Sequence, residues 1–476
     1  MAEKQSQSLE FSKNLEAHET PIDGLVWYDL PVHGDRRGWF KENWQRERML
    51  DAGMLDFGPV QNNVSFNAEA GVTRGLHAEP WDKFVSIGHG RIFGAWCDLR
   101  EGSATYGKVF TLEMDPSRAI FVPRGVANGF QALENNTVYM YLVNDHWSPE
   151  ADYAFVNLAD PELHIDWPIS LDQATMSDKD KSHPPLKSVT PLKPKKVMIT
   201  GANGQLGRAL RELYPDADYV GRDGLDISDE TTLQTARRWR DYGIIVNAAA
   251  YTAVDTAETP EGRREAWATN ARAVGNLARI ATEYGITLVH VSSDYVFDGT
   301  VSPHTEGEPF SPLGVYAQSK AAGDIAAATA PRHYIARTSW VVGNGNNFVK
   351  TMAGLADRGI KPSVVDDQIG RLTFASTLAA GIKHLIDSRA AYGTYNITNS
   401  GDAVSWAEIA RTAYDSKGQS PDDVTPVHTA AYYAGKDGIA PRPLQSTMSL
   451  EKIEATGFKP TDWRDELKTY LDSLIG

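Results

Sequence analysis

A glycine-rich fingerprint, TGANGQLG, occupies residues 200–207, near the middle of the chain rather than near its start. It follows the short apolar run 197–199 and opens a segment, 206–213, whose apolar residues recur with helical spacing. In a dinucleotide-binding unit the first glycine makes the tight turn, the second lets the backbone approach the pyrophosphate, and the third allows close packing of helix on strand. Because such a unit does not need the nearly two hundred residues before it, we expect the chain to carry a second function.

Composition narrows the classes of function. A chain of 476 residues is too long for one ordinary core, and 41% hydrophobic with 23% charged residues is typical of a soluble globular protein. The net charge of −15, with no basic block on any predicted helix, argues against nucleic acid and anionic membranes as partners. Cys97 is the single cysteine, so an intrachain disulfide or a thiolate metal cluster is excluded. Residues 1–20 contain no apolar signal segment, and no run approaches the ~20 apolar residues of a membrane helix; we expect a cytoplasmic protein.

Pattern changes along the chain predict its domains. Prolines alternate with charged residues at 177–194, which we interpret as a semi-extended linker. Upstream, period-two alternation and short apolar runs separated by glycine-containing turns favour an all-β sandwich or jelly roll. Downstream, apolar strands alternate with helical stretches, which indicates a parallel α/β sheet. The predicted organisation is an N-terminal extension (1–20), a β domain (21–176), the linker (177–194) and an α/β domain (195–476).

Residues that carry chemistry follow the fingerprint. Tyr316 and Lys320 lie four residues apart on one face of a predicted helix, and an ammonium beside a phenol lowers the phenol pKa toward neutrality. Such a pair is also common on solvated helix surfaces. The small residues 247–250 and the hydroxyls at 292–293 each follow a buried strand, at the edge where parallel sheets bind ligands. Together these features predict reduction of a carbonyl, with hydride from a nicotinamide and a proton from Tyr316.

The α/β half resembles the extended short-chain dehydrogenase/reductase family and, within it, the dTDP-4-dehydrorhamnose reductases. The resemblance spans about 195–476 and is carried by TGANGQLG, NAAAYTAVDTAE (247–258), SSDYVFDG (292–299), YAQSK (316–320), RTSWVVG (337–343), DDQIGR (366–371) and APRPLQS (440–446). It implies a catalytic triad of Ser293, Tyr316 and Lys320. The implied cofactor-binding residues are Gly201, Asn203, Gly204, Gln205, Leu206, Gly207, Asp226, Ile227, Ala248, Ala249 and Ala250, together with Tyr316 and Lys320. The implied substrate contacts are Asp255, Trp340 and Asn347, although a tryptophan after a strand is usually part of a core.

Three positions bear on specificity within that family. Arg222 follows the predicted second strand, where it either pairs with an adenosine 2′-phosphate and favours NADPH over NADH, or is a surface arginine. Ser293 stands where the family often has threonine, a change that keeps the hydroxyl. The sequence 371–373 reads Arg-Leu-Thr in place of the family's usual proline-threonine, so the sugar is less defined than the reaction. Some relatives need Mg²⁺ for dimerisation, and the sequence leaves that requirement open.

The upstream half contains candidate groups for acid–base catalysis. A lone histidine in a β domain is most often structural, and His77 lacks the His-x-His spacing of a metal-binding jelly roll, since glycine and glutamate stand two residues away on either side. We therefore expect no metal. His77 is a candidate base, and Lys83 a candidate stabiliser of enolate charge. Period two places Tyr139 and Tyr141 on one face, and spacing alone leaves either as the acid.

Residues 22–168 resemble the dTDP-4-dehydrorhamnose 3,5-epimerase family of metal-free, cupin-type jelly rolls. The matching segments are HGDRRGWFKENW (33–44), VQNNVSF (60–66), TRGLH (73–77), DLREGSATYGK (98–108) and ADPELHIDWP (159–168). The resemblance implies that His77 is the base, Asp160 its orienting carboxylate, Tyr141 the acid and Lys83 the oxyanion stabiliser. The positions that it assigns to substrate or nucleotide are Arg37, Glu42, Gln61, Asn63 and Arg74, with Asn128 where most members carry histidine.

The two resemblances together imply a bifunctional enzyme of dTDP-L-rhamnose synthesis: a cupin-type jelly roll, then a Rossmann fold with a small substrate-binding subdomain. The first half would epimerise C3 and C5 of dTDP-4-dehydro-6-deoxy-glucose, and the second would reduce the C4 ketone with NADPH or NADH. Epimerases of this type generally dimerise through the jelly roll, so we expect a homodimer. Two alternatives remain open. In the first, the chain acts on a related deoxysugar; in the second, its jelly roll is a non-catalytic module for sugar-nucleotide binding or dimerisation.

Overall fold

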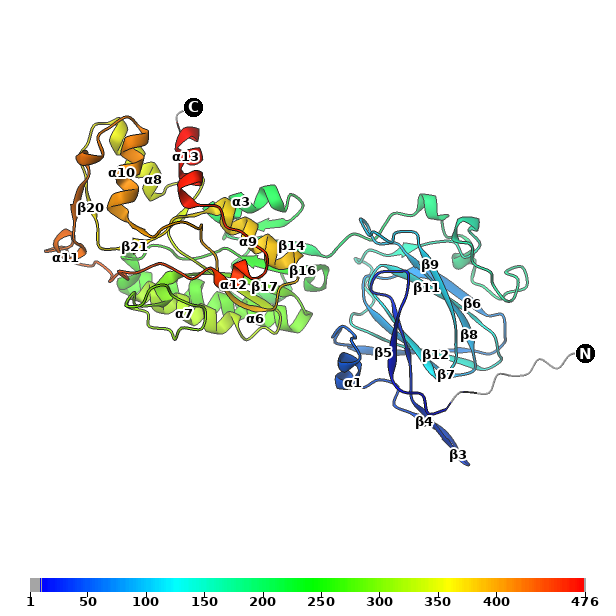
Figure 1. The fold of residues 1–476 in the computed structure, drawn as a ribbon. Coiled ribbons are helices and arrows are strands. Elements are labelled where there is room, and N and C mark those ends of the chain that lie inside the picture. Colours follow the sequence, from blue (N-terminus) through cyan, green and yellow to red (C-terminus); the bar gives the residue numbers. More distant parts are fainter. Residues whose placement is uncertain (1–8, 10, 475–476) are drawn as a thin grey trace, which may run out of the picture. The chain divides into compact units, whose positions relative to one another are not determined.

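The computed structural model describes residues 9 and 11–474. Its contacts divide the chain into two compact units, Met1–Pro194 and Lys195–Gly476 (Figure 1). Each unit has its own hydrophobic cores, and each is described here by itself. Within the described residues, no helix is both long enough and apolar enough to cross a membrane.

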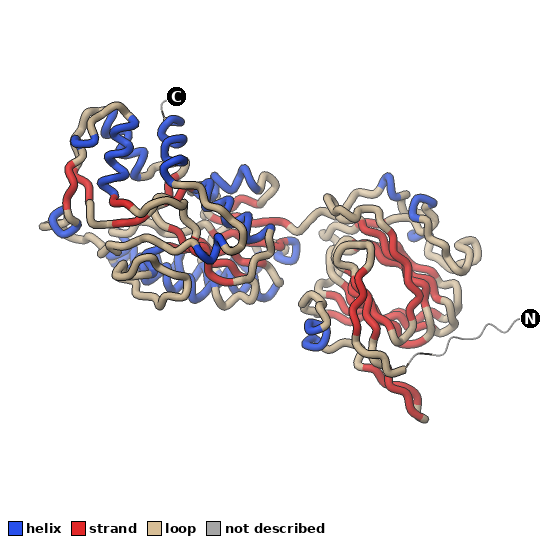
Figure 2. Tube along the Cα trace, viewed as in Figure 1, coloured by secondary structure: helices blue, strands red, loops and turns tan. Residues whose placement is uncertain are grey.

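Two antiparallel sheets that face each other build the first unit (Figure 2). The six-stranded sheet has the order β1 (Glu16–Glu19), β2 (Val26–Asp29), β10 (Arg118–Val122), β7 (Lys83–His89), β12 (Thr137–Val143), β5 (Gln61–Asn67). The five-stranded sheet has the order β13 (Ala154–Phe155), β6 (Thr73–Ala78), β11 (Val126–Ala132), β8 (Ile92–Asp98), β9 (Val109–Met114). Apolar side chains of both sheets, among them Val85, Ile120, Trp96 and Phe130, form one buried core between them. The predicted all-β sandwich is therefore present.

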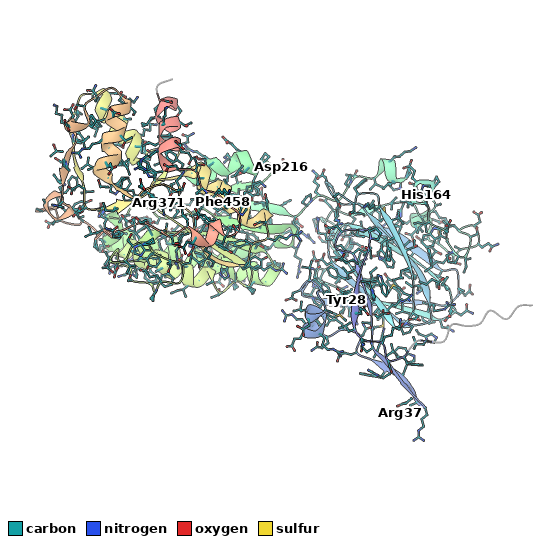
Figure 3. The ribbon with its side chains drawn as sticks, in the orientation of Figure 1. Tyr28, Arg37, His164, Asp216, Arg371 and Phe458 are labelled. Carbon is teal, nitrogen blue, oxygen red and sulfur yellow. The ribbon has the colours of Figure 1, made fainter. Side chains whose placement is uncertain are left out.

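A hairpin of β3 (Val32–Asp35) and β4 (Gly38–Lys41) projects from the sandwich and is followed by the short helix α1 (Arg46–Asp51). Arg37 lies at its tip, away from the body of the sheets (Figure 3). The base of the hairpin is anchored by the half-buried Lys41, whose ammonium donates to the Ile87 and Pro116 carbonyls at 2.8 and 3.0 Å. The hairpin exposes Phe40, whose exposed fraction is 69%.

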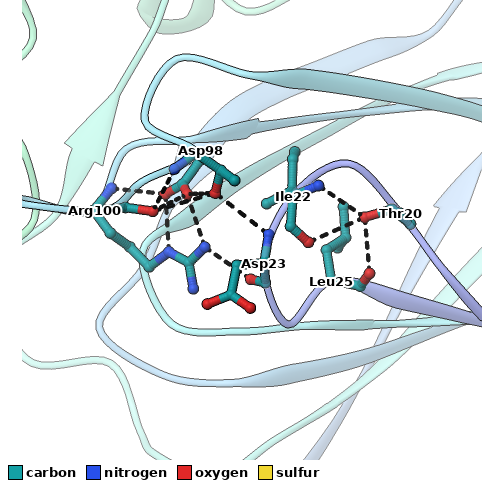
Figure 4. A network of polar contacts seen from close by, with 8 residues as sticks. Thr20, Ile22, Asp23, Leu25, Asp98 and Arg100 are labelled. Carbon is teal, nitrogen blue, oxygen red and sulfur yellow. Dashed lines mark hydrogen bonds and ion pairs between the residues drawn. The ribbon is translucent and has the colours of Figure 1, made fainter.

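A buried carboxylate ties the start of the described chain to the turn after β8 (Figure 4). Asp98, which has no exposed surface, accepts hydrogen bonds from Arg100 Nε at 2.9 Å and from the Ser103 and Thr105 hydroxyls at 2.6 Å. The Asp23 backbone joins by donating to Thr105 Oγ1 at 3.3 Å and accepting from Arg100 Nη2 at 2.8 Å. Burial opposes ionisation of Asp98, but these bonds outweigh it and lower its pKa to about 2.

The segment 177–194, which we predicted to be a semi-extended linker, packs instead against the first unit. It contains α2 (Asp178–Lys181) and a 3₁₀ turn, Leu186–Ser188, and Asp180, His183 and Leu192 are buried. The Leu192 backbone exchanges hydrogen bonds with Leu99 and Glu101. The prolines and charges that suggested a linker lie between apolar residues, and these apolar residues pack on the five-stranded sheet. This interpretation of the segment was wrong.

A six-stranded parallel sheet organises the second unit. Its order is β15 (Asp218–Val220), β14 (Lys196–Thr200), β16 (Tyr242–Asn247), β17 (Thr287–Ser293), β18 (His333–Thr338), β23 (Gly393–Asn396). Because successive residues of a strand point to opposite faces, Met198 packs with α6 (Ala273–Tyr284) in one core. Its neighbour Ile199 packs with α3 (Gln205–Leu213) and α9 (Ala375–Asp387) in another. The sheet is thus covered on both faces by helices, as its continuous apolar strands predict.

A smaller cluster of helices and two-stranded ladders adjoins this sheet. Three helices share its core: α8 (Phe348–Asp357), α10 (Trp406–Ser416) and α13 (Trp463–Ser473). The ladders pair β19 (Val341–Val342) with β22 (Thr373–Phe374), β20 (Ser363–Val365) with β25 (Thr425–Val427), and β21 (Ile369–Gly370) with β24 (Val404–Ser405). The remaining helices are α4 (Glu230–Thr235), α5 (Pro260–Trp267), α7 (Val315–Ala327), α11 (Thr429–Tyr432) and α12 (Glu451–Glu454).

Candidate active sites

The first candidate site lies in the interior of the sandwich and draws on both sheets. His77 on β6 and Asn128 on β11 face each other across the ladder of the five-stranded sheet. Lys83 on β7 and Tyr141 on β12 come from the opposite sheet. The Lys83 ammonium and the Asn128 amide meet at 2.8 Å, so this contact joins the two sheets.

The carboxylate beside His77 is Asp180. Nε2 of His77 lies 2.8 Å from Oδ1 of Asp180. Burial opposes ionisation of this carboxyl, but the hydrogen bond and charge of His77 outweigh it and lower the Asp180 pKa. Asp160, to which we assigned this role, instead accepts hydrogen bonds from the backbone of Glu162 and Leu186 at 3.0 and 2.5 Å. Asp160 caps a 3₁₀ turn, and its assignment as the partner of His77 does not agree with this geometry.

Lys83 is held in place by two oxygens. Its ammonium donates to Glu79 Oε1 at 2.5 Å and to Asn128 Oδ1 at 2.8 Å, and only 5% of the residue is exposed. The same ammonium lies 5.2 Å from the centre of the Tyr141 ring. A buried cation with a paired carboxylate satisfies the requirement for burying charge, and one side of it remains next to Tyr141.

The structure distinguishes the two tyrosines that spacing left open. Tyr139 stacks on Phe130 with 4.2 Å between ring centres, and Asn128 Nδ2 donates to its hydroxyl at 3.4 Å. Burial raises the pKa of Tyr139 well above its ordinary value. Tyr141 also has a raised pKa, from burial and then Glu79, although the Arg74 charge opposes this shift. Tyr141 is therefore the tyrosine that lies among the charged residues.

The five residues predicted at substrate or nucleotide positions lie in three places. Arg74 lies on β6 and is exposed, and its Nε donates to Asn67 Oδ1 of β5 at 3.3 Å. Gln61 and Asn63 share a 2.8 Å hydrogen bond on the edge strand β5. Arg37 and Glu42 lie on the projecting hairpin and just after it, where Arg37 pairs with Asp35 and Glu42 with Arg48. Their polar contacts are thus made around the hairpin rather than with the interior groups.

The second candidate site is the fingerprint turn after β14. Gly201 has φ +66°, and a Cβ there would stand 2.5 Å from the Ala248 carbonyl oxygen. A Cβ on Gly207 would collide with the Gly201 carbonyl. The turn therefore lies against the end of β16, at residues 248–250, and both glycines are required for the close approach. The sheet order reverses between β14 and β16, the position at which open parallel sheets bind ligands.

Several groups around this turn fit a dinucleotide. The N-cap residue of α3 is Gly204, which has no side chain to bind the first N–H groups of the helix. These N–H groups can therefore bind phosphate. Gln205 Oε1 is buried without a hydrogen-bond partner among the described residues. Asp226 accepts from the Ser228 backbone and hydroxyl at 2.9 and 2.6 Å. Arg222 is exposed beside it, and its charge contributes to a lowered Asp226 pKa after the Ser228 bonds.

The remaining residues predicted to contact the cofactor lie near the same turn. Leu206 is buried in the core beneath α3, and Ile227 is buried with α6. Asn203 is exposed, and its side-chain amide nitrogen lies 3.5 Å from a Cβ built on Gly221. Asn203 therefore approaches the end of β15, on the side of the turn opposite to residues 248–250.

The Ser-Tyr-Lys set lies between β17 and α7. Ser293 ends β17, and its hydroxyl donates to Asp294 Oδ1 at 2.9 Å. Burial, followed by the Asp294 charge, raises the pKa of Tyr316 to about 12, while a hydrogen bond with Ser293 opposes the shift. Lys320 donates to the Val291 carbonyl at 2.7 Å, and burial lowers its pKa to about 8. The expected lowering of the Tyr316 pKa by Lys320 is therefore wrong here, because burial dominates both groups.

The predicted sugar contacts make strong interactions within the protein. Asp255 forms an ion pair with Arg442 and accepts from the Ala440 backbone at 3.0 Å. Trp340 stacks on Trp406 at 3.8 Å between ring centres, as a core tryptophan would. Asn347 caps α8 by accepting from Lys350 N at 2.9 Å, and it donates to the Tyr470 hydroxyl at 2.7 Å.

Four residues of these sites were not foreseen. Asp180 and Glu79 bind His77 and Lys83, Asp294 adjoins Ser293 and Tyr316, and Arg442 holds Asp255. Asp294 and Arg442 lie inside the family-like segments SSDYVFDG and APRPLQS, so a charged residue in each segment could have been recognised as a candidate site residue. Asp180 could not be recognised in this way, because it falls in a run of alternating charges at 178–181.

The first unit has an imidazole–carboxylate pair between two sheets, and the second has a Ser-Tyr-Lys set beside a glycine turn. These features define a two-part enzyme, with one part suited to proton transfer at carbon and the other to nucleotide-dependent reduction. The family model described as dTDP-4-dehydrorhamnose 3,5-epimerase matches residues 19–188, and the one described as RmlD substrate binding domain matches residues 195–475. The chain belongs to both families, as an epimerase–reductase fusion, and the predicted resemblances are confirmed.

Known proteins cover each half separately. The Protein RmlC homolog of Streptococcus pyogenes serotype M6 is 52% identical over 193 residues, which are 39% of this chain and 96% of that protein. The dTDP-4-dehydrorhamnose reductase of Aggregatibacter actinomycetemcomitans is 37% identical over 288 residues, which are 57% of this chain and 97% of that one. A crystal structure of the Bacillus anthracis dTDP-4-dehydrorhamnose reductase in complex with NADP aligns with TM-score 0.54 and 34% identity, covering 59% of this chain and 99% of that chain.

Proposed function

We propose that this chain catalyses two consecutive steps of dTDP-L-rhamnose synthesis. The substrate of the first step is dTDP-4-dehydro-6-deoxy-glucose, epimerised at C3 and C5. The second step reduces the C4 ketone. The observation that carries the proposal is the coexistence, in one chain of these two families, of the His77–Asp180 pair with the Ser293–Tyr316–Lys320 set. The fold assignment that accompanies it is a cupin-type jelly roll followed by a Rossmann fold with a small substrate-binding subdomain.

In the epimerisation, Asp180 fixes the tautomer of His77. An ionised carboxylate at 2.8 Å accepts the Nε2 proton, which leaves a lone pair on Nδ1 as the base. The protons at C3 and C5 are both α to the C4 carbonyl, so each removal produces an enolate on the same oxygen. The Lys83 ammonium stabilises that oxygen. Tyr141, next to Lys83, returns a proton to carbon from the opposite side, and proton exchange with solvent restores both groups.

In the reduction, the protein positions the ketone and supplies a proton. NADPH, when bound at the fingerprint turn, supplies the hydride. The Ser293 hydroxyl donates to the ketone oxygen, and Tyr316 gives it the proton as the alkoxide forms. The raised Tyr316 pKa keeps the phenol protonated before the reaction. Arg222 beside Asp226 supports NADPH over NADH, because a guanidinium pairs with a 2′-phosphate; the NADP complex of the Bacillus anthracis relative agrees with this choice.

A homodimer formed through the jelly roll completes the proposal. The edge strand β5 exposes Val64 and Phe66 to 63% and 60%, and an apolar edge strand without a neighbour is a pairing surface. We expect Phe66→Lys to lower the mass measured by sedimentation, and no change would argue against this interface. We place the protein in the cytoplasm, where its proposed nucleotide-sugar substrate is made and used.

The proposal is tested by following the products of the whole chain by NMR in D₂O. We expect dTDP-L-rhamnose with deuterium at C3 and C5 when NADPH is present. With Tyr316→Phe, deuterium should still enter at both carbons while the ketone persists. With His77→Ala, exchange should stop. Exchange at one carbon would instead indicate a related deoxysugar pathway, and no exchange in the unaltered chain would indicate a non-catalytic jelly roll.

A further inference from the structure

Beside the His77–Asp180 pair lies a second histidine, which the proposed mechanism does not use. Nε2 of His183 is 3.9 Å from Oδ1 of Asp180, the same oxygen that contacts His77. The two imidazole rings are 5.3 Å apart between centres and nearly perpendicular, at 77°. One ligating atom from each of the three residues can be chosen so that all lie within 4.8 Å of one another.

His183 is buried more deeply than its neighbour. Only 5% of its side chain is exposed, against 32% for His77. Its ring stacks on Phe155 at 4.8 Å between centres. Apart from a weak contact with the Gly75 backbone, neither ring nitrogen has a hydrogen-bond partner among the described residues. The ring of His183 is thus held by packing, and its Nε2, which faces Asp180, remains available as a ligand.

We propose that His77, Asp180 and His183 form a binding site for a divalent transition-metal ion, with Zn²⁺ as the best fit, and that the bound ion switches the epimerase off. Two imidazoles and one carboxylate are a common three-residue ligand set of zinc, which leaves a fourth position open. Zinc–ligand bonds of about 2.0–2.2 Å at tetrahedral angles place ligand atoms about 3.3–3.5 Å apart. The observed separations of 2.8 and 3.9 Å lie on either side of this spacing, so small side-chain rotations complete the site.

The inhibition follows from the tautomer of His77, and this part of the inference rests on the proposed epimerase function. A metal on Nε2 displaces the proton that Asp180 otherwise accepts. A neutral imidazole bound through Nε2 then carries its proton on Nδ1, the nitrogen that must be free to act as base. Asp180 becomes a metal ligand at the same time. Metal binding and proton abstraction are therefore mutually exclusive.

The sequence did not indicate this site because its ligands are far apart. We expected no metal, since His77 has no histidine two residues away. The other two ligands are Asp180 in α2 and His183 just after it, which follow His77 by 103 and 106 residues in the chain. They reach His77 because the segment 177–194 packs on β6. The Asp180–His183 spacing of three places both side chains on the same side of that turn.

The first experiment measures binding without catalysis. The full chain, freed of metal with EDTA and dialysed, is titrated with Co²⁺ while its visible absorption is recorded. We expect the absorption of a four- or five-coordinate site to saturate at one Co²⁺ per chain and to disappear on adding Zn²⁺. His183→Phe keeps the stack on Phe155 but removes a ligand, so it should abolish that absorption. The matched control is His164→Asn, at an exposed histidine outside the cluster whose φ of +49° asparagine tolerates.

The second experiment measures both activities of the same sample. Zn²⁺ should stop deuterium exchange at C3 and C5, EDTA should restore it, and reduction of the already epimerised ketone should continue. For His183→Phe, the Zn²⁺ concentration that halves its own metal-free exchange rate should rise at least about tenfold; His164→Asn should behave as the unaltered chain. Near-UV circular dichroism checks folding, and His183→Gln replaces His183→Phe if the latter unfolds.

Three outcomes overturn the inference: no saturable Co²⁺ site, unchanged Zn²⁺ sensitivity in the folded His183 variant, or equal loss of both activities in every variant. A chain that shows no C3 or C5 exchange before metal is added refutes the proposed epimerase instead. In that case the Co²⁺ spectra still decide whether the three residues bind metal.

Discussion

Nε2 of His77 and Oδ1 of Asp180 lie 2.8 Å apart although 103 residues separate them in the chain. The contact exists because α2 folds back onto β6, and Ser177 caps that turn by accepting from Asp180 N at 3.1 Å. The residues just before the second unit therefore contribute a side chain to the first candidate site. Substitutions between 177 and 183 should affect epimerisation directly and not only the spacing of the units.

The two candidate carboxylates can be separated by substitution. Asp180→Asn leaves His77 without an anion to hold its tautomer and stabilise its charged form, so we expect the C3 and C5 exchange rates to fall by about 10²–10⁴. Asp160→Asn is the control, because within the described residues its oxygens accept hydrogen bonds from backbone N–H groups alone. It should lower thermal stability while leaving most of the exchange rate. The opposite ranking in the NMR exchange assay would restore Asp160 as the partner of His77.

Asn128 is expected to act through Lys83. Its Oδ1 accepts from the ammonium at 2.8 Å, and a hydrogen bond to a charged group contributes about 1.5–3 kcal/mol. Asn128→Leu removes that acceptor at similar volume, so kcat for exchange should fall by about tenfold to a hundredfold. Asn128→His, which supplies a ring nitrogen and the residue usual in the family, should recover a larger part of kcat. A change confined to KM would show that Asn128 contacts the substrate rather than positioning Lys83.

The fold class was more predictable than the site. Alternating apolar residues and turn glycines predict an all-β sandwich, and the fingerprint predicts a tight strand-to-helix turn at Gly201, because these patterns are local. Asp180 was missed because its role depends on a return of the chain that no local pattern encodes. The Tyr316 pKa was misjudged for a related reason. Spacing indicates that Lys320 is near Tyr316, but it does not show how strongly burial disfavours the charged form of each group, and burial decides the direction of both shifts.

Asp98 should make the first unit sensitive to acid. Its folded pKa of about 2 lies below the ordinary value of 3.8, so its contribution to stability is complete above about pH 4 and is lost as pH falls through about 2. The shift corresponds to about 2 kcal/mol. Asp98→Asn should destabilise the first unit by a similar amount at pH 7 and flatten its stability between pH 4 and 2. Urea unfolding followed by tryptophan fluorescence measures both, and an unchanged pH slope would remove Asp98 as the cause.

Lys320 should set the alkaline limit of the reductase. Burial lowers its pKa to about 8, so the ammonium that would assist Tyr316 is lost as pH rises through 8. We expect kcat/KM for the ketone to fall above that pH. The Lys320→Arg variant, whose side chain stays charged, should have a lower maximum but no such fall up to pH 9. The C3 and C5 exchange of the same chain, measured over the same range, controls for unfolding.

Gly201→Ala should disconnect the two activities. The methyl group would stand 2.5 Å from the Ala248 carbonyl, at a φ of +66° that alanine rarely adopts. The fingerprint turn must move away from residues 248–250 to admit it, which displaces the α3 amides that would bind the pyrophosphate. We expect nucleotide affinity, measured by quenching of tryptophan fluorescence, to fall at least about tenfold, with C3 and C5 exchange unchanged. Gly354→Ala in α8, where a Cβ meets nothing within 4 Å, should change neither, and unaltered nucleotide affinity in Gly201→Ala would place the cofactor elsewhere.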